Sequence, residues 1–492
     1  MSKELAVTTT RKEKLSHLIE DLQEGLLERE QQVKLLLLSA ISGEHLLLLG
    51  PPGTAKSELA KRLKSAFFEA NYFERLLTRF SVPEELFGPL SIKALEEDQY
   101  KRLTQGYLPS CTVAFIDEIF KANSAILNSL LTVLNERQFD NGSQRIDIPL
   151  VSIVAASNEL PEGEELAALY DRFLLRSYVN PISDDAFETL LTSGSIKCKP
   201  SLDNKLNQND LKDIQEGAEQ VKLSSSILDL CREYRAHLNA SDIYVSDRRW
   251  RKIIKLLKVA AISNEQTEVS IYDGWLIPHC LWQKPEQYNE LNELFESKIC
   301  YSGEFNPSQL VSQIVVWEEQ LITESVGSEH LKDKNGKLLY LKPDGTNTTK
   351  SKEKLLKKNS RGEQLYKDYH GRETTSEYGN EEIKEMVNYE PLYFDRTYSK
   401  AHIEGRVTAV TTLKNEVTVL LNNLSFEAKN VSNNLESNIW IDNSLIEVAN
   451  NGLQNAIDDV NQLLKRSDAL VEGYEKLPLE IDIEASINAI ES

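Results

Sequence analysis

The sequence predicts an α/β protein in which a parallel sheet carries a phosphate-binding loop, followed by an all-α lid and a helical stalk with a small β-rich insert. Three features of the 492 residues lead to this prediction. Short apolar runs alternate with stretches of helical spacing from residue 45 to about 180, which is typical of a parallel sheet covered by helices. Helical spacing then dominates from 207 to 325 and from 424 to 477. Between these two regions lies a segment rich in Lys, Gly, Asn, Thr and Tyr, with few aliphatic residues.

Each predicted element follows from its own pattern. Residues 15–41 have the apolar spacing of an amphipathic helix, which Gly25 divides in two. We expect strands at 46–49, 76–79, 113–116, 151–156 and 174–179, because these runs are short and apolar. Further strands are predicted at 403–412 and 416–421, where apolar and polar residues alternate. The domains are then a core at 1–190, a lid at 191–285, a discontinuous stalk at 286–326 and 414–492, and an insert at 327–413. We expect no internal repeat in the chain.

Charge and cysteine content restrict the class of protein. The formal net charge is −21 at pH 7, which argues against a surface devoted to nucleic acid or anionic lipid. The five cysteines are far apart and form no CxxC pair, which favours reduced thiols over a disulfide framework. The first fourteen residues are polar, and the longest apolar stretch, 35–49, is interrupted and too short to cross a membrane. We therefore expect a cytoplasmic protein with no membrane span and no zinc site.

The chain is organised around residues 46–57, where four leucines precede Gly50-Pro51-Pro52-Gly53-Thr54-Ala55-Lys56-Ser57. A buried strand, a tight loop and a helix start form a cradle for phosphate, because the loop N–H groups and the positive end of the helix face the anion. Lys56 would reach the outer phosphates of ATP, and the hydroxyl of Ser57 would bind Mg²⁺. Ala55 stands where the usual pattern has glycine, which predicts a negative φ there. The alternative is an ordinary strand–turn–helix with a chance Lys-Ser pair.

Two further strand ends carry polar residues suited to hydrolysis. The apolar run 113–116 leads to Asp117 and Glu118, as in a Walker B segment. Asp117 would hold Mg²⁺, mostly through water, and Glu118 would polarise the attacking water. The run 151–156 leads to Asn158, which could position that water or contact the γ-phosphate. For Asn158, capping of a turn is the structural alternative.

Two arginines are candidates for contact with the nucleotide from outside the loop. Arg172 would act as a finger inserted into the site of a neighbouring subunit, because its planar fork contacts two phosphate oxygens and stays charged. Arg176 is a second candidate for this role, and a surface pair between Asp171 and Arg172 is the structural alternative. Arg248 lies at the start of a predicted lid helix and would contact the phosphates from the lid.

In this order, the five elements resemble AAA+ ATPases. The loop that lacks its last glycine, together with Phe-Gly-Pro-Leu-Ser at 87–91 and Gly-Tyr-Leu-Pro at 106–109, is similar to the MoxR branch of that class. Tyr-Val-Ser-Asp-Arg-Arg-Trp at 244–250 and Ile-Trp-Ile-Asp-Asn-Ser-Leu at 439–445 resemble the RavA subfamily. The resemblance is strong over about residues 15–285 and loose beyond them.

The resemblance implies a hexameric ATPase that uses ATP and Mg²⁺ and acts in chaperone-like fashion beside a partner with a von Willebrand factor A domain. In enterobacterial RavA proteins, the small module on the helical stalk binds an inducible lysine decarboxylase. The corresponding segment here, 327–413, is rich in lysine and departs from that pattern. Residues 332–367 contain eleven Lys or Arg against four Asp or Glu, which would steer an acidic protein partner to this segment. A flexible, solvated loop is the structural alternative.

The predicted function is therefore ATP hydrolysis coupled to the remodelling or regulation of a protein client. Two alternatives stay open at this point. A nucleic-acid motor or loader could use the same core, although the segment 137–149 offers only Arg137 and Arg145 beside Asp140 and Asp147. A scaffold in which the nucleotide only holds a ring together would not need Glu118. We expect no nucleic-acid partner.

Overall fold

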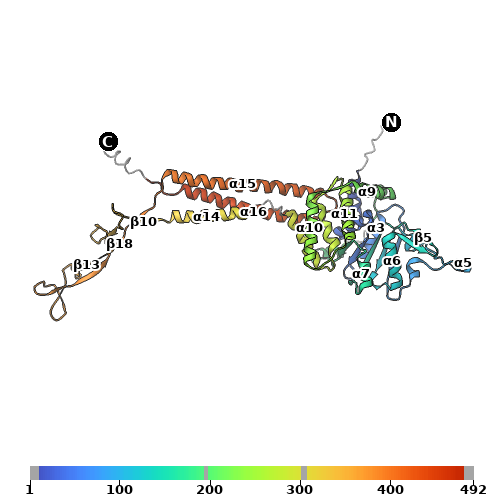
Figure 1. The fold of residues 1–492 in the computed structure, drawn as a ribbon, viewed down its shortest axis with the longest axis horizontal. Helices are drawn as coiled ribbons and strands as arrows, with labels where there is room; N and C mark the ends of the chain where they lie inside the picture. The colour runs from blue at the N-terminus through green and yellow to red at the C-terminus, as the bar shows by residue number, and fades with distance from the viewer. Residues whose placement is uncertain (1–9, 193–197, 301–306, 481–492) are drawn as a thin grey trace, which may run out of the picture. The chain divides into compact units, whose positions relative to one another are not determined.

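The computed structural model describes residues 10–192, 198–300 and 307–480 (Figure 1). The chain divides into two compact units, each with its own apolar core. The first unit comprises residues 1–304 and 426–455, and the second comprises 305–425 and 456–492. Two long helices, α15 (Lys400–Ser437) and α16 (Asn443–Glu475), contribute residues to both units.

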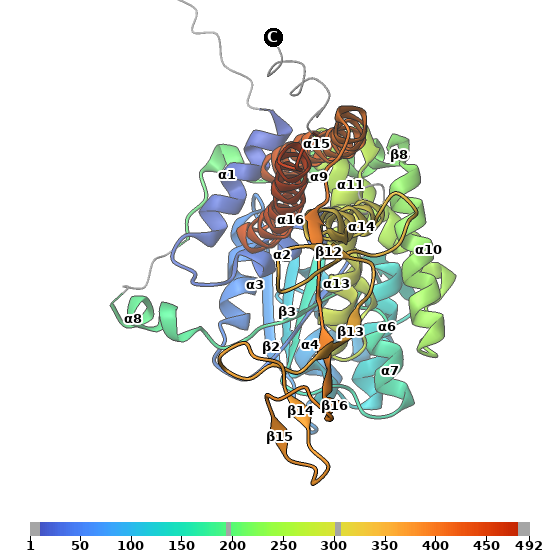
Figure 2. The same cartoon turned by 90° about the vertical axis from the view of Figure 1, so that its left-hand side faces the viewer.

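A five-stranded parallel sheet forms the centre of the first unit, with strand order β2-β3-β6-β1-β7. Its strands are β1 (Leu46–Leu49), β2 (Tyr72–Leu76), β3 (Val113–Asp117), β6 (Ser152–Ser157) and β7 (Leu175–Tyr178). Every residue of β1 and β6 is buried, as expected for parallel strands covered on both faces. Helix α2 packs on β1, β6 and β7, and Figure 2 shows α3 and α6 on opposite sides of the strands. The predicted parallel α/β core is confirmed.

Helices and short loops surround this sheet. The helices are α1 (Arg11–Gln23), α2 (Glu30–Ser42), α3 (Lys56–Ser65), α4 (Pro83–Phe87), α5 (Ile92–Glu96), α6 (Ser124–Glu136), α7 (Glu164–Tyr170) and α8 (Asp184–Thr192). The hairpin β4 (Gln138–Asn141) and β5 (Gln144–Asp147) follows α6, and short 3₁₀ turns lie at Leu108–Ser110, Ile119–Lys121 and Leu202–Asn204. The division of the first helical stretch at Gly25 is confirmed, because α1 ends at Gln23 and α2 begins at Glu30.

The strand predicted at 76–79 is wrong, since the observed strand is β2 at Tyr72–Leu76. β2 lies at the edge of the sheet, next to β3. Only Phe73 of its five residues is buried, and Leu76 is exposed. An edge strand with one buried side chain has no apolar run that could mark its position.

The lid follows the core within the first unit. Its helices are α9 (Gln208–Gln220), α10 (Ser225–Ala240), α11 (Asp247–Ser263), α12 (Leu276–Leu281) and α13 (Gln287–Cys300), joined by the short strands β8 (Lys222–Leu223) and β9 (Glu268–Val269) and a 3₁₀ turn at Ile271–Trp275. Helix α11 packs against both α9 and α2, so the lid rests directly on a helix of the core.

The turn between α15 and α16 is built into the first unit. Trp440 is fully buried, and its Nε1 donates to Ser263 Oγ at 2.9 Å. The Nζ of Lys34 donates to the carbonyl of Ile441, and Gln31 Nε2 donates to Asp442 Oδ2 at 3.2 Å. The turn therefore contacts the lid helix α11 and the core helix α2 together.

In the second unit, α14 (Ser308–Ser325) packs with parts of α15 and α16 around Ile314, Val410, Val417, Val460 and Tyr474. The strands predicted at 403–412 and 416–421 are wrong, because this whole stretch belongs to α15. Many of its residues are Val or Thr, which favour strands. The buried residues Val410, Leu413, Val417 and Leu424 nevertheless recur at three to seven positions, the spacing of one helix face. In the described residues, we find no helix both long and apolar enough to span a membrane.

A β-rich segment between α14 and α15, residues 328–395, is here called the β module. Its strands are β10 (Ser328–His330), β11 (Tyr340–Leu341), β12 (Asn347–Thr348), β13 (Lys352–Leu356), β14 (Tyr366–Lys367), β15 (Glu373–Thr374), β16 (Glu381–Glu382), β17 (Lys384–Asn388), β18 (Glu390–Pro391) and β19 (Tyr393–Asp395). All their pairings are antiparallel. The predicted β-rich insert is thus observed.

The β module contains an internal repeat, so the expectation of no repeat is wrong. The hairpin β11–β12 and the hairpin β14–β15 are related by a shift of 26 positions. The same shift relates the turn bonds Gly336 N to Asp333 O and Gly362 N to Asn359 O, both 2.9 Å. Gly345 and Gly371 also correspond, and both have positive φ. The repeat is one of turn geometry, in which Asp and Asn are interchangeable because either side chain can cap the turn. Few residues need to be identical, so the repeat is hard to see in the sequence.

Candidate nucleotide site

The phosphate-binding loop, residues 50–57, connects β1 to α3 at the carboxyl end of the sheet. Gly50 has a φ of 143°, and a Cβ there would lie 2.4 Å from the carbonyl oxygen of Val179, so no larger residue fits. Lys56 is buried at the start of α3, and its Nζ donates to the carbonyls of Gly50 at 2.6 Å and Pro51 at 2.9 Å. Burial lowers the pKa of Lys56, while Asp117 and Glu118 oppose the shift. The lysine charge is thus held at the mouth of the loop.

Ala55 has a φ of 68°, so the expected negative φ is wrong. The residue is the N-cap of α3 in the left-handed conformation, and its carbonyl accepts from Leu59 N at 3.0 Å. This conformation costs a non-glycine residue about 1–2 kcal/mol. The surrounding loop and helix therefore hold Ala55 in a strained state, which is common where a backbone is shaped for a ligand.

Asp117, Glu118 and Asn158 meet beside the loop because β3 and β6 are neighbours that end at the same edge. Asn158 Oδ1 accepts from Lys56 Nζ at 3.0 Å, and Asn158 Nδ2 donates to Glu118 Oε1 at 2.6 Å. Lys121 also pairs with Glu118, at 3.2 Å. The sequence-predicted residues from three separate strand ends are thus joined in one polar chain, Lys56–Asn158–Glu118.

Asp117 and Ser57 are suited to a magnesium ion. Burial raises the pKa of Asp117, and Lys56 opposes this shift. Asp117 Oδ1 accepts from the backbone N–H of Glu118 at 3.0 Å, which fixes the carboxylate. Glu118 has a φ of 52°, so it too is held in the left-handed region. A carboxylate and a hydroxyl are the hard oxygen ligands that Mg²⁺ takes, usually together with water and substrate phosphate.

Arg29 is a buried residue that sequence reasoning missed. Its guanidinium donates to the carbonyl of Thr54 at 3.4 Å and to that of Asn180 at 2.7 Å. It therefore ties the phosphate loop to the segment after β7. Arg29 and Asn180 also line a cavity of about 530 Å³, together with His279 and Tyr288 of the lid. Only a cation directly before an apolar helix could have pointed to this residue, and that signal is common at helix starts.

The candidate fingers lie at the opposite end of the sheet. Arg172 lies three positions before the first residue of β7 and therefore near the amino end of that strand, whereas the phosphate loop follows the carboxyl end of β1. Its Nε is buried and has no hydrogen-bond partner in the described part of the chain. Asp171 pairs with Arg249 at 3.1 Å and not with Arg172, so the surface pair considered above does not form.

Arg176 and Arg248 are not part of the polar chain at the loop. Arg176 is buried, stacks 3.8 Å from the centre of the Tyr170 ring, and donates to the carbonyl of Trp282. Burial, assisted by Arg249, lowers the pKa of Arg176 to about 9. Arg248 donates to Asn135 Oδ1 at 3.1 Å, near the end of α6. The carbonyl of Leu134, next to Asn135, lies 3.2 Å from Nε2 of His45, which directly precedes β1. Asn135 and Arg248 therefore lie near the amino end of the sheet and not at the phosphate loop of the same chain.

Residues 13–216 match the model of the MoxR domain in the MoxR-vWA-beta-propeller ternary systems, and residues 223–295 match an AAA lid domain. The uncharacterized protein MJ0079 of Methanocaldococcus jannaschii is 42% identical over 270 residues, which cover 55% of this chain and 70% of that protein. MJ0812 of the same organism is 39% identical over 291 residues, covering 59% and 77%. This chain belongs to the MoxR family of AAA+ proteins.

A solved structure adds a looser likeness to this MoxR-family chain. The crystal structure of a Cytophaga hutchinsonii protein covers 58% of this chain and 93% of its own, with a TM-score of 0.47 and 17% identity.

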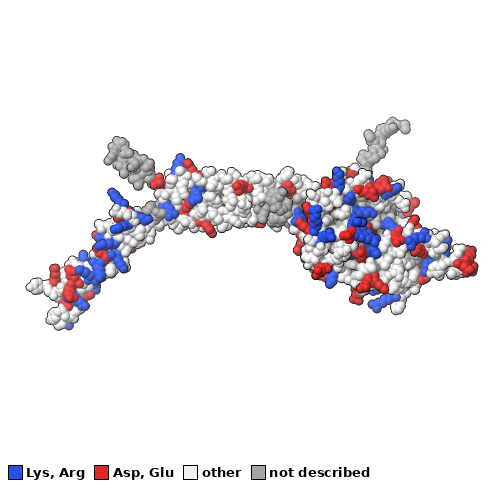
Figure 3. All heavy atoms as spheres, in the orientation of Figure 1, with Lys and Arg blue, Asp and Glu red and all other residues white. Residues whose placement is uncertain are grey.

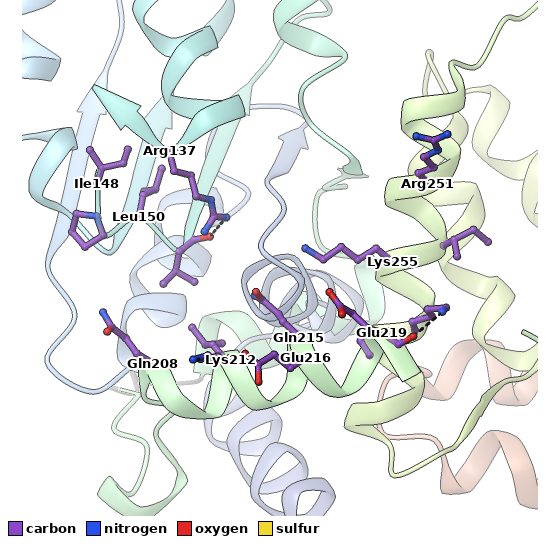
Figure 4. Close-up of a pocket in the computed structure, with 16 residues that line it drawn as sticks. Arg137, Ile148, Leu150, Gln208, Lys212, Gln215, Glu216, Glu219, Arg251 and Lys255 are labelled. Carbon is purple, nitrogen blue, oxygen red and sulfur yellow. Dashed lines mark hydrogen bonds and ion pairs between the residues drawn. The ribbon is translucent and has the colours of Figure 1, made fainter. Parts of the chain in front are cut away.

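A second cavity of about 770 Å³ lies between the segment before β6 and the lid helices α9 and α11 (Figure 4). Arg137 lines it and donates to the carbonyls of Gly43 at 2.7 Å and Val151 at 2.9 Å. Lys212, Lys255 and Arg251 project from the lid helices on its other walls. Because it borders the amino end of β6, this cavity is separate from the phosphate loop of the MoxR core.

Proposed function

We propose that this MoxR-family chain is a RavA-type cytoplasmic ATPase that works as a ring, with six subunits the expected number, and couples ATP hydrolysis to the remodelling or regulation of a protein client. The observation that carries the proposal is the polar chain Lys56–Asn158–Glu118 beside a strained phosphate loop. A nucleotide site needs a cation for the outer phosphates, a carboxylate for the attacking water and a group that links the two. All three are present at one edge of the sheet.

In the proposed mechanism, the backbone of residues 50–55 binds the phosphates of ATP, and Lys56 stabilises charge on the outer ones. Mg²⁺, held by Ser57 and Asp117, would neutralise charge between the β- and γ-phosphates. Glu118 orients and polarises the attacking water. Asn158 contacts both Lys56 and Glu118, so loss of the γ-phosphate would change its hydrogen bonds and those of the water-activating carboxylate.

The finger must come from another subunit, because Arg172 and the phosphate loop lie at opposite ends of the same sheet. Between the two candidate fingers, we favour Arg172. Both side chains have a buried Nε without a partner. The terminal nitrogens of Arg176 nevertheless donate to carbonyls and its guanidinium stacks on Tyr170, whereas the described residues provide no hydrogen-bond or ion-pair partner for the side chain of Arg172. The same topology supports a role for Arg248 at a neighbour's nucleotide and not at its own.

The site also has a direct connection to the helices of the C-terminal region. Arg29 contacts the phosphate loop, and α2 begins at the next residue. Lys34, one turn further along α2, donates to the carbonyl of Ile441 in the turn between α15 and α16. A change at the loop can therefore reach this turn through a single rigid helix, which supports coupling of the nucleotide state to a distant partner.

We propose that the β module is the part of this chain that binds the protein client. Residues 332–367 carry an excess of basic residues, but residues 368–395 carry eight Asp or Glu against two Lys or Arg. The fold pairs the two parts, as in β13 with β17 and in the ion pair of Lys357 with Glu373 at 2.6 Å. Figure 3 shows basic and acidic side chains gathered over this module. Steering by net charge is therefore weak, and exposed turn aromatics such as Tyr369 and Tyr378 are better candidates for contact with a client.

The name of the matched family model links MoxR domains to vWA partners. On this basis we propose that a protein with a von Willebrand factor A domain acts together with this chain. A lysine decarboxylase is a candidate client of the β module, by resemblance only.

The nucleic-acid alternative is disfavoured by the hairpin β4–β5. Arg145 pairs with Asp140 at 2.7 Å and Glu136 at 3.1 Å, and Arg137 donates to backbone carbonyls. Both arginines of this segment are therefore engaged within the protein. An assay of phosphate release, with and without single- or double-stranded DNA, tests the proposal. We expect hydrolysis that DNA leaves unchanged; stimulation by DNA would favour a nucleic-acid motor, and binding of ATP without any hydrolysis would favour a scaffold.

A further inference from the structure

A buried arginine of the lid holds the backbone on both sides of Arg172. Arg249 is the third residue of α11, which begins at Asp247 after the N-cap Ser246. The residue is only 6% exposed. One terminal nitrogen donates to the carbonyl and the carboxylate of Asp171, both at 3.1 Å, and the other donates to the carbonyls of Phe173 at 3.1 Å and Leu174 at 2.9 Å.

The lid itself is bound by the same side chain. Arg249 Nε donates to the carbonyl of Cys280 at 2.7 Å, just before the end of α12. Two further bonds run between the same segments: Tyr170 Oη donates to the carbonyl of Gln283 at 2.8 Å, and Arg176 donates to that of Trp282. The segment 170–176 is therefore fastened to the lid before and after Arg172.

We propose that Arg249 is a positioning residue that fixes the finger Arg172 to the lid of its own subunit. When the lid of one subunit moves, the finger that this subunit offers to its neighbour moves with it. The inference rests on the proposed role of Arg172 as a finger acting in trans. It adds to that role a physical connection by which the nucleotide state of one subunit controls ATP hydrolysis in the neighbouring subunit.

The physical reason lies in the irregular backbone at 171–174. This segment is neither helix nor strand, so its carbonyls have no ladder to bond with, and buried carbonyls need a donor. A guanidinium presents five N–H groups in a fixed fork and can satisfy several carbonyls at once, whereas an ammonium cannot hold the same geometry. Because the carbonyls on either side of Arg172 accept from Arg249, the backbone of Arg172 cannot shift without breaking these bonds.

The test uses mixed rings of full-length subunits. Arg249→Met should keep ATP binding at its own phosphate loop but lower kcat on the order of 10- to 100-fold, the loss expected when a catalytic group is misplaced by about 1 Å. Mixing Arg249→Met with Lys56→Ala should recover activity, because the Lys56→Ala subunit supplies an intact finger to an intact loop. Arg172→Ala mixed with Lys56→Ala should recover in the same way. Arg172→Ala mixed with the double variant Lys56→Ala/Arg249→Met should not recover, since neither subunit then supplies a well-placed finger.

The outcomes separate this inference from the proposed function. If Arg172→Ala and Lys56→Ala fail to complement, the shared site itself is wrong. If they complement but Arg249→Met and Lys56→Ala do not, Arg249 is a structural bond between lid and core, and the inference is overturned. Arg251→Met is the matched control, an exposed arginine of the same helix, and should hydrolyse ATP at the parental rate. If Arg249→Met does not fold, Arg249→Lys takes its place. Mixing Arg249→Lys with Lys56→Ala should then recover ATP hydrolysis.

Discussion

The core and the β module use charged side chains in opposite ways. In the core and the lid that packs on it, Arg29, Arg62, Arg176 and Arg249 are at most 6% exposed, and each donates to backbone carbonyls at helix ends or in irregular segments. In the β module, charged side chains pair across the surface, as Lys357 does with Glu373 and Lys350 with Glu353. A buried arginine fixes a backbone, and its loss leaves several carbonyls without a donor. A surface pair contributes little to stability and can be replaced.

The difference indicates where the molecule must be rigid. Three of these buried arginines lie where segments that carry functional residues leave regular structure: at the phosphate loop for Arg29, and at the finger segment for Arg176 and Arg249. The turns of the β module are instead set by Asp, Asn and Gly, as in the repeated turns at 333–336 and 359–362. Local turn chemistry tolerates changes in the exposed residues between the turns, which suits a surface that adapts to a partner.

The largest expected effect is at the phosphate loop. Lys56→Ala should nearly abolish nucleotide binding, because it removes the cation that contacts the phosphates. Glu118→Gln should keep binding and reduce turnover by about 10²–10⁴-fold, the range for loss of a general base. Equilibrium binding of a fluorescent ATP analogue, together with phosphate release, separates the two effects. Turnover of Glu118→Gln at the parental rate would contradict the role given to that carboxylate.

The second prediction separates the two regions by deletion. Replacing residues 328–395 with a short Gly/Ser linker should leave ATP hydrolysis and assembly nearly unchanged, since the β module contributes no residue to the nucleotide site. Capture of protein clients should be lost. Because basic and acidic parts pair within the module, capture by the intact protein should change little between low and physiological salt.

The matched control for this deletion is the variant Tyr369→Ser/Tyr378→Ser, which keeps the module and removes two exposed aromatics. Weakened capture by this variant would assign the contact to the turns. A deletion that abolishes hydrolysis would instead show that the β module belongs to the motor.

The third prediction compares one buried arginine with one surface lysine. Arg62 donates to the carbonyls of Leu22 at 2.8 Å and Glu24 at 2.6 Å, away from the nucleotide site. Arg62→Met should lower the free energy of unfolding of the first unit by about 2–4 kcal/mol, because both carbonyls lose a buried donor. Lys357→Met, which breaks only a surface pair, should leave the unfolding midpoint unchanged. Urea titrations followed by circular dichroism measure both variants. Equal losses of unfolding free energy would contradict the different contributions expected of a buried arginine and a surface pair.

The sequence pattern alone predicted the elements that are apolar throughout or that carry a short motif. The four leucines of β1 and the strand ends at Asp117 and Asn158 were placed because buried parallel strands are apolar throughout. The edge strand β2 and the helix over 400–421 were misplaced, since the first buries one residue and the second is rich in β-branched residues. The partners of Arg29 and Arg249 could not be predicted, because a backbone carbonyl that accepts a hydrogen bond has no sequence signature. The same holds for the left-handed conformation of Ala55, which the loop imposes against the preference of the residue.

The smallest expected effect concerns pH and the turn between α15 and α16. Asp273 is fully buried, accepts from Ser270 N at 2.8 Å, and accepts from Asn438 of this turn at 3.3 Å. Burial raises the pKa of Asp273 to about 6, against an ordinary value near 4. Between about pH 4 and pH 6 the folded protein therefore binds this proton more tightly than the unfolded chain. The contribution of Asp273 to stability falls as pH rises through that window and is constant above it.

Asp273→Asn removes this titration. The amide cannot accept all the bonds of the carboxylate, so we expect a constant loss of stability in addition to the altered slope. The measurement is the difference in unfolding free energy between parent and variant at pH 4.5, 5.5, 6.5 and 7.5, which cancels the other titrating groups. As pH rises through the lower part of this range, the unfolding free energy of the parent should fall by about 2 kcal/mol relative to that of the variant. Amide hydrogen exchange at residues 438–442 should be slower at pH 5 than at pH 7, after correction for the intrinsic rate. Parallel pH profiles for parent and variant would mean that Asp273 stays ionised throughout and that its bonds to Ser270 and Asn438 outweigh the cost of its burial.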